Sequence, residues 1–259
     1  MTYPYGDLAS QYATGDPLRA RIETHRRYSE RDLDLDAISR RLLGLRGDES
    51  LLDVGCGPGL FLAYLRQAGH RGRLVGLDQS PGMIAEAGVG VIGDVQTLPF
   101  VDGAFDAVSA RHMLYHVPDI PVALREIARV AGRAGALVMT NAGEYMPLIN
   151  DLRAEAARAF GRPAVAESVG LRFHDSNARA YLEAAFARVE ETRLENALVF
   201  VRPEPILRYL WSVFQGPGDP PWPELETWLR PEAERRLAAM GGLWRDPKQI
   251  AIFRCFLHN

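Results

Sequence analysis

Between residues 51 and 141 the chain alternates short apolar runs with longer amphipathic stretches. Residues 51–54 form an apolar run that is typical of a strand buried on both faces. Residues 73–77 are predicted to form a second strand. A helix is predicted after each strand, with Pro58 and Pro81 suited to its first turn. This alternation predicts an α/β fold with a doubly wound parallel sheet.

Helix and strand patterns continue on both sides of this region. Residues 1–47 are predicted to be helical after a loose start, with one helix from Asp16 and a second from about Asp34.

Residues 143–200 are predicted to hold two helices around an irregular loop, the second capped near Asp175 or Ser176. Period-two alternation predicts a strand over 188–196, and residues 249–257 are predicted to form the last strand.

Three glycines follow the first predicted strand at alternate positions. Gly55, Gly57 and Gly59 allow the backbone to turn sharply and to approach a ligand closely. The dinucleotide-binding fingerprint needs its third glycine one position later, where this chain has Leu60. Asp78 ends the neighbouring strand, where its carboxylate can accept hydrogen bonds from both hydroxyls of a ribose. The pattern therefore predicts an adenosine ligand.

Polar residues and glycines gather at one predicted edge of the sheet. Ligands of such sheets bind beyond the carboxyl ends of the strands. The segment 53–59, Asp78, Asp94 and Arg111 fall at the ends of four successive strands. We expect this edge to be the ligand-binding edge.

The segment between the last two strands, residues 201–246, is predicted to be a helical insertion that projects over this edge as a cap. It holds the proline-rich stretch GPGDPPWP and all four tryptophans. A cap lined by aromatic rings suits an apolar or aromatic ligand. In the alternative interpretation, these rings form only the small core of the cap. The predicted organisation is an N-terminal helical lid (1–47), a core (48–200 and 247–259) and this cap.

The order and spacing of these segments resemble the class I S-adenosylmethionine (SAM)-dependent methyltransferases, specifically a bacterial small-molecule subgroup of the methyltransferase type 11 kind. Residues 51–59 resemble the family's first motif, and Gly93-Asp94-Val95 resembles its acid after the third strand. Residues 105–108 resemble the fourth strand, and residues 111–119, RHMLYHVPD, resemble the segment that follows it. One departure is AGRAG at residues 131–135, where many members have a Lys-Pro-Gly-Gly turn remote from the cofactor.

The resemblance implies a Rossmann-like sheet of seven strands with an antiparallel last strand, SAM as cofactor and S-adenosylhomocysteine as product. It assigns Asp78 to the ribose and Asp94 to the adenine. Asp53 has two interpretations, both retained: its carboxylate accepts hydrogen bonds from amides of the glycine turn, and it receives the cofactor's ammonium directly or through water. The implied cofactor site in the core consists of Asp53, Gly55, Cys56, Gly57, Gly59, Asp78, Gln79, Met83, Asp94, Val95 and Arg111.

Two further stretches near the N-terminus resemble parts of the family. Tyr12 lies in YGDLASQYATG, which is similar to the aromatic lid of many small-molecule methyltransferases, although it could equally pack on the domain. Residues 25–29, HRRYS, resemble the same subgroup, which places Arg27 and Tyr28 near the amino-acid end of the cofactor. An arginine can bind a carboxylate with two parallel hydrogen bonds. The alternative for Arg27 is a solvated helix face.

Methyl transfer needs a base only if the acceptor must lose a proton. His112 and His116 are the candidates, and they would share one face if their segment is helical. Tyr115 and His174 are reserves. Alternatively, His116 is a structural residue beneath the site and His112 shapes the cofactor pocket. HMLYH lacks the glutamate that a zinc-protease motif carries after its first histidine, so no metal site is expected.

Composition narrows the choice of partners. The 259 residues carry a net charge of −3, which argues against a nucleic-acid partner. Almost all basic residues are arginine, and Lys248 is the only lysine. No window approaches the roughly 18 consecutive apolar residues of a membrane span, so a cytoplasmic protein with a small-molecule acceptor is expected. Cys56 and Cys255 lie far apart, without metal or redox spacing.

Three rival functions remain open at this point. A nicotinamide dehydrogenase would require Leu60 to substitute for the missing glycine. An RNA methyltransferase would require a basic surface across the ligand edge. A non-catalytic SAM-binding or regulatory protein could retain every cofactor-binding residue and lack an acceptor pocket. Neither the acceptor nor the methylated element is identified by these patterns.

Overall fold

The computed structural model describes residues 16–162, 172–215 and 219–258. The chain forms two compact units. The sheet unit comprises residues 33–143, 169–194 and 250–259, and the helical unit comprises residues 1–32, 144–168 and 195–249.

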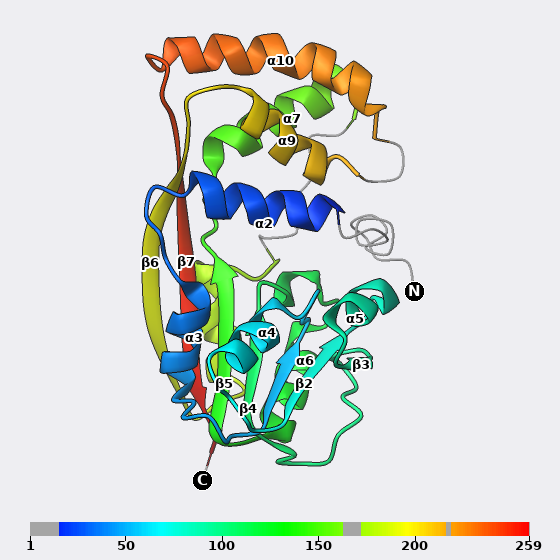
Figure 1. Ribbon diagram of the computed structural model, residues 1–259, viewed down its shortest axis with the longest axis vertical. Helices are drawn as coiled ribbons and strands as arrows, with labels where there is room; N and C mark the ends of the chain where they lie inside the picture. The colour runs from blue at the N-terminus through cyan, green and yellow to red at the C-terminus, as the bar shows by residue number, and fades with distance from the viewer. Residues whose placement is uncertain (1–15, 163–171, 216–218, 259) are drawn as a thin grey trace. The chain divides into compact units, whose positions relative to one another are not determined.

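A seven-stranded sheet has the strand order β3-β2-β1-β4-β5-β7-β6 (Figure 1). Strands β1 to β5 pair in parallel, and β7 pairs with β5 in antiparallel register. The predicted α/β architecture with an antiparallel last strand is therefore confirmed. The strands are β1 (Leu51–Val54), β2 (Leu74–Asp78), β3 (Val91–Ile92), β4 (Phe105–Arg111), β5 (Ala131–Asn141), β6 (Arg188–Phe200) and β7 (Trp244–Phe256).

Apolar side chains are buried on both faces of the sheet, as parallel strands require. Leu52 and Val54 of β1 belong to one core cluster, whereas Leu51 belongs to another. Helices α6 and α8 contribute to the first cluster, and α3 and α4 to the second. The helices of this unit are α3 (Leu35–Leu43), α4 (Leu60–Gln67), α5 (Pro81–Ala87), the 3-10 turn η1 (Leu114–His116), α6 (Ile120–Val130) and α8 (Asp175–Glu183).

Side-chain caps begin several of these helices. Asp34 caps α3 by accepting a hydrogen bond from the amide of Ala37, and Ser80 caps α5 by accepting one from Met83. The Ser80 cap therefore begins the helix that follows Asp78.

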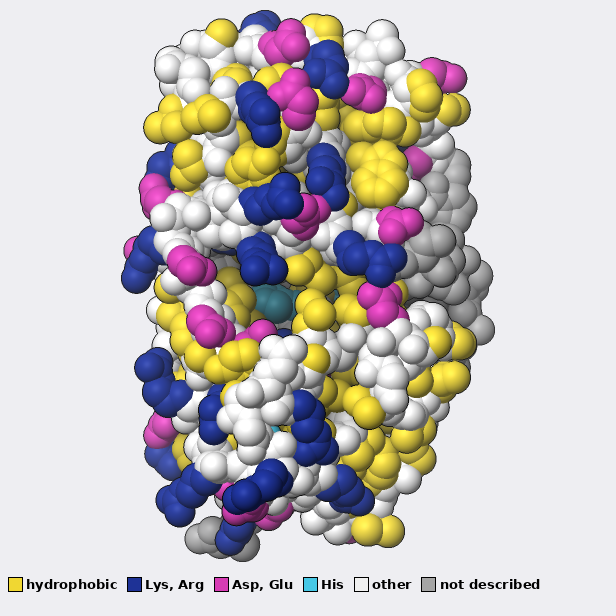
Figure 2. Space-filling model, viewed as in Figure 1, with side chains coloured by type: hydrophobic (Ala, Val, Ile, Leu, Met, Phe, Trp, Pro, Cys, Tyr) yellow, Lys and Arg dark blue, Asp and Glu magenta, His cyan; other side chains and the backbone are white. Residues whose placement is uncertain are grey.

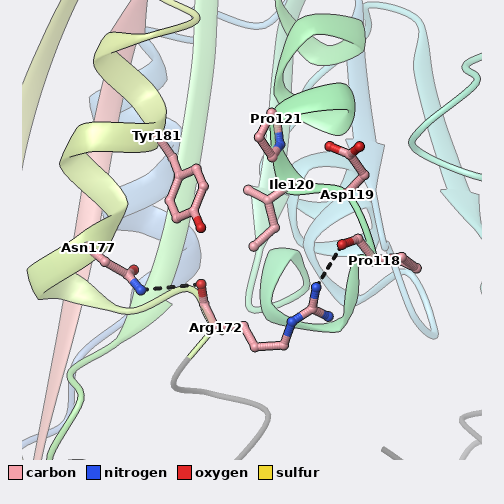
Figure 3. A pocket seen from close by; sticks show the side chains of 7 residues that line it. All are labelled: Pro118, Asp119, Ile120, Pro121, Arg172, Asn177 and Tyr181. Carbon is pink, nitrogen blue, oxygen red and sulfur yellow. Dashed lines mark hydrogen bonds between the residues drawn. The ribbon is translucent and has the colours of Figure 1, made fainter. Parts of the chain in front are cut away.

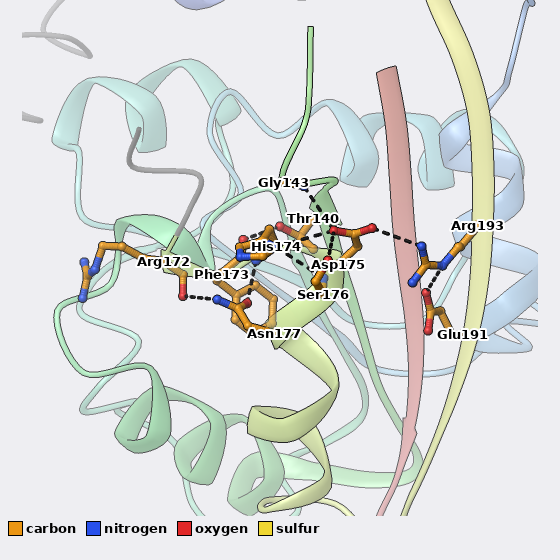
Figure 4. Close-up of polar contacts among 10 residues, drawn as sticks. All are labelled: Thr140, Gly143, Arg172, Phe173, His174, Asp175, Ser176, Asn177, Glu191 and Arg193. Atoms are coloured by element: carbon orange, nitrogen blue, oxygen red, sulfur yellow. Dashed lines mark hydrogen bonds and ion pairs between the residues drawn. The ribbon is translucent and has the colours of Figure 1, made fainter. Parts of the chain in front are cut away.

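The predicted cap of α8 is wrong by one residue or more. His174 is the N-cap, and its Nδ1 accepts a hydrogen bond from the amide of Ser176. Asn177 Oδ1 completes the cap by accepting one from the amide of His174 (Figure 4). Asp175 instead accepts a hydrogen bond from the amide of Gly143 and pairs with Arg193 at 3.1 Å. An imidazole nitrogen can accept a hydrogen bond as a hydroxyl or carboxylate oxygen does.

The helical unit has a separate apolar core. Leu152, Leu198, Ile206, Leu210 and Leu229 are fully buried in it. Its helices are α2 (Asp16–Tyr28), α7 (Pro147–Ala159), α9 (Glu204–Val213) and α10 (Trp222–Ala239), and it also contains the end of β6 and the start of β7.

Three of the four tryptophans belong to this core. Trp244 is fully buried within it, and Trp222 and Trp228 pack against it. Trp244 is also the first residue of β7, so the last strand begins five residues earlier than predicted. For these three rings, the structure matches the alternative in which they hold the helical unit together.

Among the described helices, none is both long enough and apolar enough to cross a membrane.

Candidate functional site

The turn between β1 and α4 is held in a left-handed backbone conformation at all three glycines. Gly55, Gly57 and Gly59 have φ values of 64°, 53° and 75°. The amides of Gly55 and Cys56 both donate to the carbonyl of Leu77, at 2.7 and 3.1 Å. Any other residue would be strained at the glycine positions. The turn is thus bound to the end of β2 through its backbone.

Two of these glycines also lie against neighbouring side chains. A Cβ atom on Gly55 would lie 2.6 Å from Met113 Cβ, and one on Gly59 would lie 2.9 Å from Ala87 Cβ. Both distances are shorter than a normal contact, so packing requires glycine there in addition to the dihedral angle. Met113 was not predicted as a site residue. Its contact brings the segment after β4 beside the glycine turn.

Asp78, the last residue of β2, supports the turn directly. Its Oδ2 accepts a hydrogen bond from the amide of Gly57, and its Oδ1 accepts one from the amide of Ser80, each at 2.9 Å. A carboxylate offers about four acceptor positions. The two that remain could accept two ligand hydroxyls.

Asp53 lies in the middle of β1 and is 3% exposed. Its Oδ1 accepts a hydrogen bond from the Ser109 hydroxyl at 2.5 Å. Burial raises the pKa of the Asp53 carboxyl, and the charge of Arg111 and the Ser109 hydrogen bond oppose this rise.

The predicted hydrogen bonds from the turn amides to Asp53 are wrong. The amides of Gly55, Cys56 and Gly57 donate to Leu77 and Asp78 instead. The strand register explains the difference, because it places Asp53 beside Ser109 on β4. Ser109 is a polar residue within the largely apolar strand FDAVSAR. This polar position was the sequence signal that could have identified Ser109 as part of the site.

Arg111 ends β4 and contacts two helices of the sheet unit. Its guanidinium pairs with Asp36 of α3 at 2.6 Å and lies 4.1 Å from the ring centroid of Phe61 on α4. The side chain is 18% exposed. Through these contacts, Arg111 connects the end of β4 to α3 and α4 at the predicted ligand edge. Asp36 was not predicted, since its separation from Arg111 in the chain carries no local signal.

Asp94 lies two residues after β3, beside Asp78. The amide of Gly93 donates to the Asp78 carbonyl at 3.0 Å, and Asp94 Oδ1 accepts a hydrogen bond from the amide of Gln96 at 2.9 Å. Of the other predicted residues, Val95 is buried. Met83 is also buried, whereas Gln79 is exposed.

The segment after β4 is not the helix that would align the two histidines. His112 has a φ of 52°, which is uncommon outside glycine, and its amide donates to Met139 at 2.9 Å. Only Leu114–His116 form a helical turn, of the 3-10 type. The condition for a shared helical face is therefore not met. His116 contacts the Tyr115 ring at a centroid distance of 4.6 Å.

The N-terminal candidates belong to the helical unit. Arg27 is exposed on α2 and pairs with Glu23 at 2.8 Å, which matches the alternative of a solvated helix face. The Tyr28 ring lies 5.3 Å from that of Phe200. Tyr12 lies outside the described residues.

A surface pocket of about 330 Å³ opens elsewhere in the sheet unit (Figure 3). Arg172 closes one end by donating a hydrogen bond to the carbonyl of Pro118 at 2.8 Å. None of the predicted site residues lines this pocket, which is formed by Pro118, Asp119, Ile120, Pro121, Arg172, Asn177 and Tyr181. Across the described ranges, no group of three histidine, cysteine or acidic side chains is placed to hold a metal ion.

Comparison with known proteins finds similarity to methyltransferases over part of the chain. Residues 52–139 match the family described as a methyltransferase domain. Over 102 residues the chain is 33% identical to malonyl-acyl-carrier-protein O-methyltransferase of Legionella pneumophila, which covers 36% of each chain. Over 154 residues it is 34% identical to demethylmenaquinone methyltransferase of Mycolicibacterium vanbaalenii, which covers 57% of this chain and 63% of the relative.

A solved structure extends the similarity in fold. A candidate methyltransferase from an antibiotic biosynthesis pathway in Anabaena variabilis is 18% identical, with a TM-score of 0.61 over 92% of this chain and 99% of that one. The matches to the two curated relatives span between 36% and 63% of their lengths.

Proposed function

We propose that the chain is a class I SAM-dependent methyltransferase, which binds SAM and transfers the methyl group to a small-molecule acceptor. The observation that carries this proposal is the junction of Asp78 with the glycine turn. One carboxylate positions the Gly57 amide and keeps two acceptor positions for ribose hydroxyls.

The residues at the sheet edge fit the parts of this cofactor. The left-handed glycine turn leaves the backbone without side chains where the ligand would approach. Asp78 would hold the ribose and Asp94 the adenine, while the buried Asp53 would receive the ammonium directly or through water. SAM, when bound, supplies a sulfonium carbon that is already activated, so the protein's task is alignment and exclusion of water.

A base is required only for acceptors that must lose a proton, and His116 and His112 remain the proposed residues. His174 is a weaker reserve because its Nδ1 is engaged in the cap of α8. His116→Ala is expected to lower turnover by about 100-fold, the lower end for loss of a general base, with SAM affinity unchanged. Steady-state kinetics with a methylated acceptor would check this. A change in SAM affinity alone would favour the structural alternative for His116.

The acceptor is proposed to be a small molecule. The two relatives are named for a malonyl acyl-carrier thioester and a quinone precursor, which supports that class. In this proposal residues 1–47 form a lid and residues 201–246 form a cap. On the face in Figure 2, acidic side chains are interspersed with basic ones, which gives no support to an RNA acceptor.

The test is calorimetric titration of the full chain with SAM, S-adenosylhomocysteine and NAD. Micromolar binding of the first two, without binding of NAD, is the expected result. Tight NAD binding would replace the proposal with a nicotinamide-dependent activity. Absence of all binding would refute it. Binding without turnover across an acceptor panel that includes quinols, acyl thioesters and RNA would favour the non-catalytic alternative.

A further inference from the structure

The only lysine of the chain is buried inside the helical unit. Lys248 lies on β7 and is 5% exposed. Its Nζ donates a hydrogen bond to Ser29 Oγ at 2.7 Å and lies 3.3 Å from His25 Nδ1. An ammonium group has three N–H donors. Two of them are thus accounted for by polar groups of α2 and of the residue after it.

The ammonium of Lys248 lacks an acidic partner among the residues that the structure describes. Several other cations of the helical unit do have acidic partners. On the same strand, Arg245 pairs with Glu30 at 2.7 Å, and on α10 Arg236 pairs with Glu155 and Glu232. Burying a charge without a counter-charge is costly. An anion that binds beside the Lys248 ammonium would offset this cost of burial.

Further cationic and aromatic groups accompany Lys248. The His25 ring lies 5.7 Å from the Tyr209 ring in an edge-on arrangement and 6.1 Å from the Tyr145 ring. Arg153 of α7 interacts electrostatically with Tyr209, and burial lowers its pKa. We call Lys248, Ser29, His25, Tyr209 and Tyr145 the Lys248 cluster.

The acidic groups of the surroundings are engaged elsewhere. Asp246, two residues before Lys248, accepts hydrogen bonds from the amides of Leu148 and Ile149 at the start of α7. Asp219, the acid that interacts with Arg153, also pairs with Arg162 at 3.8 Å. Neither of these carboxylates is therefore paired with the Lys248 ammonium.

We propose that the Lys248 cluster binds the carboxylate of a small aromatic acid. The ammonium supplies the counter-charge, Ser29 and His25 hold it in position, and the tyrosine rings contact the apolar part of the ligand. The site is formed entirely by residues of the helical unit and does not depend on methyl transfer.

Direct binding to the full chain tests the proposal, with benzoate as the aromatic acid, benzamide as its uncharged analogue and inorganic phosphate as a simple anion. Calorimetry should detect benzoate at millimolar concentration or below and should not detect benzamide. Equal binding of both aromatic compounds would overturn the role of the charge. Binding of phosphate alone would overturn the assignment to an aromatic carboxylate, and absence of benzoate binding would overturn the site.

Lys248→Met is the decisive variant and should weaken benzoate binding at least tenfold. Lys248→Gln, which keeps a donor for Ser29, should behave in the same way and serves if the methionine variant does not fold. Arg245→Met is the matched control, since this residue lies on the same strand, is 49% exposed and is paired with Glu30. It should leave the affinity unchanged. Wild-type affinity in the folded Lys248 variants would refute the proposal.

Discussion

The charged groups Asp53 and Arg111 at the ligand edge of the sheet unit have an opposite charge close by, whereas Lys248 of the helical unit has no acidic partner among the described residues. At the ligand edge of the sheet unit, Asp53 is bonded to Ser109, and Arg111 is paired with Asp36. In the helical unit, Lys248 contacts only Ser29 and His25 among the described residues.

This difference separates two kinds of polar burial. A paired charge can position neighbouring elements, and removal of one partner leaves the other partner uncompensated. A buried charge without a counter-charge destabilises the folded state until a ligand supplies one. Removing one partner of the ion pair in the sheet unit should therefore lower the free energy of unfolding. Removing the Lys248 charge in the helical unit should raise it.

The largest effect is expected on cofactor binding at the sheet edge. Asp78→Ala removes the proposed acceptors of both ribose hydroxyls and should weaken SAM binding by about 100-fold, or about 3 kcal/mol. Calorimetric titration measures this, with circular dichroism to verify the fold. Asp48→Ala, which removes an exposed acid, is the control. Unchanged affinity in Asp78→Ala would remove the ribose assignment.

Breaking the ion pair of the sheet unit should destabilise it. Asp36→Ala leaves the Arg111 guanidinium without its carboxylate and should lower the free energy of unfolding by about 2 kcal/mol. This value is below that of a fully buried pair because both side chains are partly exposed. Urea denaturation measures the change, again with Asp48→Ala as control. A loss equal to that of the control would show that the pair contributes little.

Removing the charge of the helical unit should instead stabilise the fold. Lys248→Met is expected to raise the free energy of unfolding by about 1 to 2 kcal/mol at pH 7. Burial lowers the pKa of Lys248 from 10.5 to about 8. Between these values the unfolded state binds more protons than the folded state, so the stability of the wild type rises with pH.

The stability difference between wild type and Lys248→Met should therefore shrink from about pH 8 towards pH 10.5. Urea denaturation at pH 7 and pH 9.5 checks this. A difference that is the same at both pH values would contradict the burial of an uncompensated ammonium.

The smallest effect concerns the hydroxyl that supports Asp53. Ser109→Ala should lower the free energy of unfolding by about 1 kcal/mol at pH 7. It should also raise the pKa of Asp53 further, because the hydrogen bond favours the charged form. Carboxyl NMR titration of wild type and variant measures the pKa. Ser176→Ala, at an exposed serine of α8, is the control, and an unchanged Asp53 pKa would contradict the assignment.

Local sequence patterns determined the architecture of this protein and its resemblance to a known family. The glycine turn, Asp78 and the alternation of strand and helix are encoded within short segments, because dihedral preference and hydrophobic periodicity act over a few residues. The predicted sheet and the resemblance to class I SAM-dependent methyltransferases are confirmed. The assignments of individual cofactor residues and histidines stay predictions.

Only the tertiary structure decided which distant side chains meet. Ser109 reaches Asp53 through strand register, and Ser29 reaches Lys248 across 219 positions of the chain. The left-handed backbone of His112, which separates the two histidines, follows no glycine or proline signal. Packing and register act between segments that are remote in sequence. No local pattern could therefore reveal that one buried carboxylate is hydrogen-bonded while one buried ammonium lacks an acid.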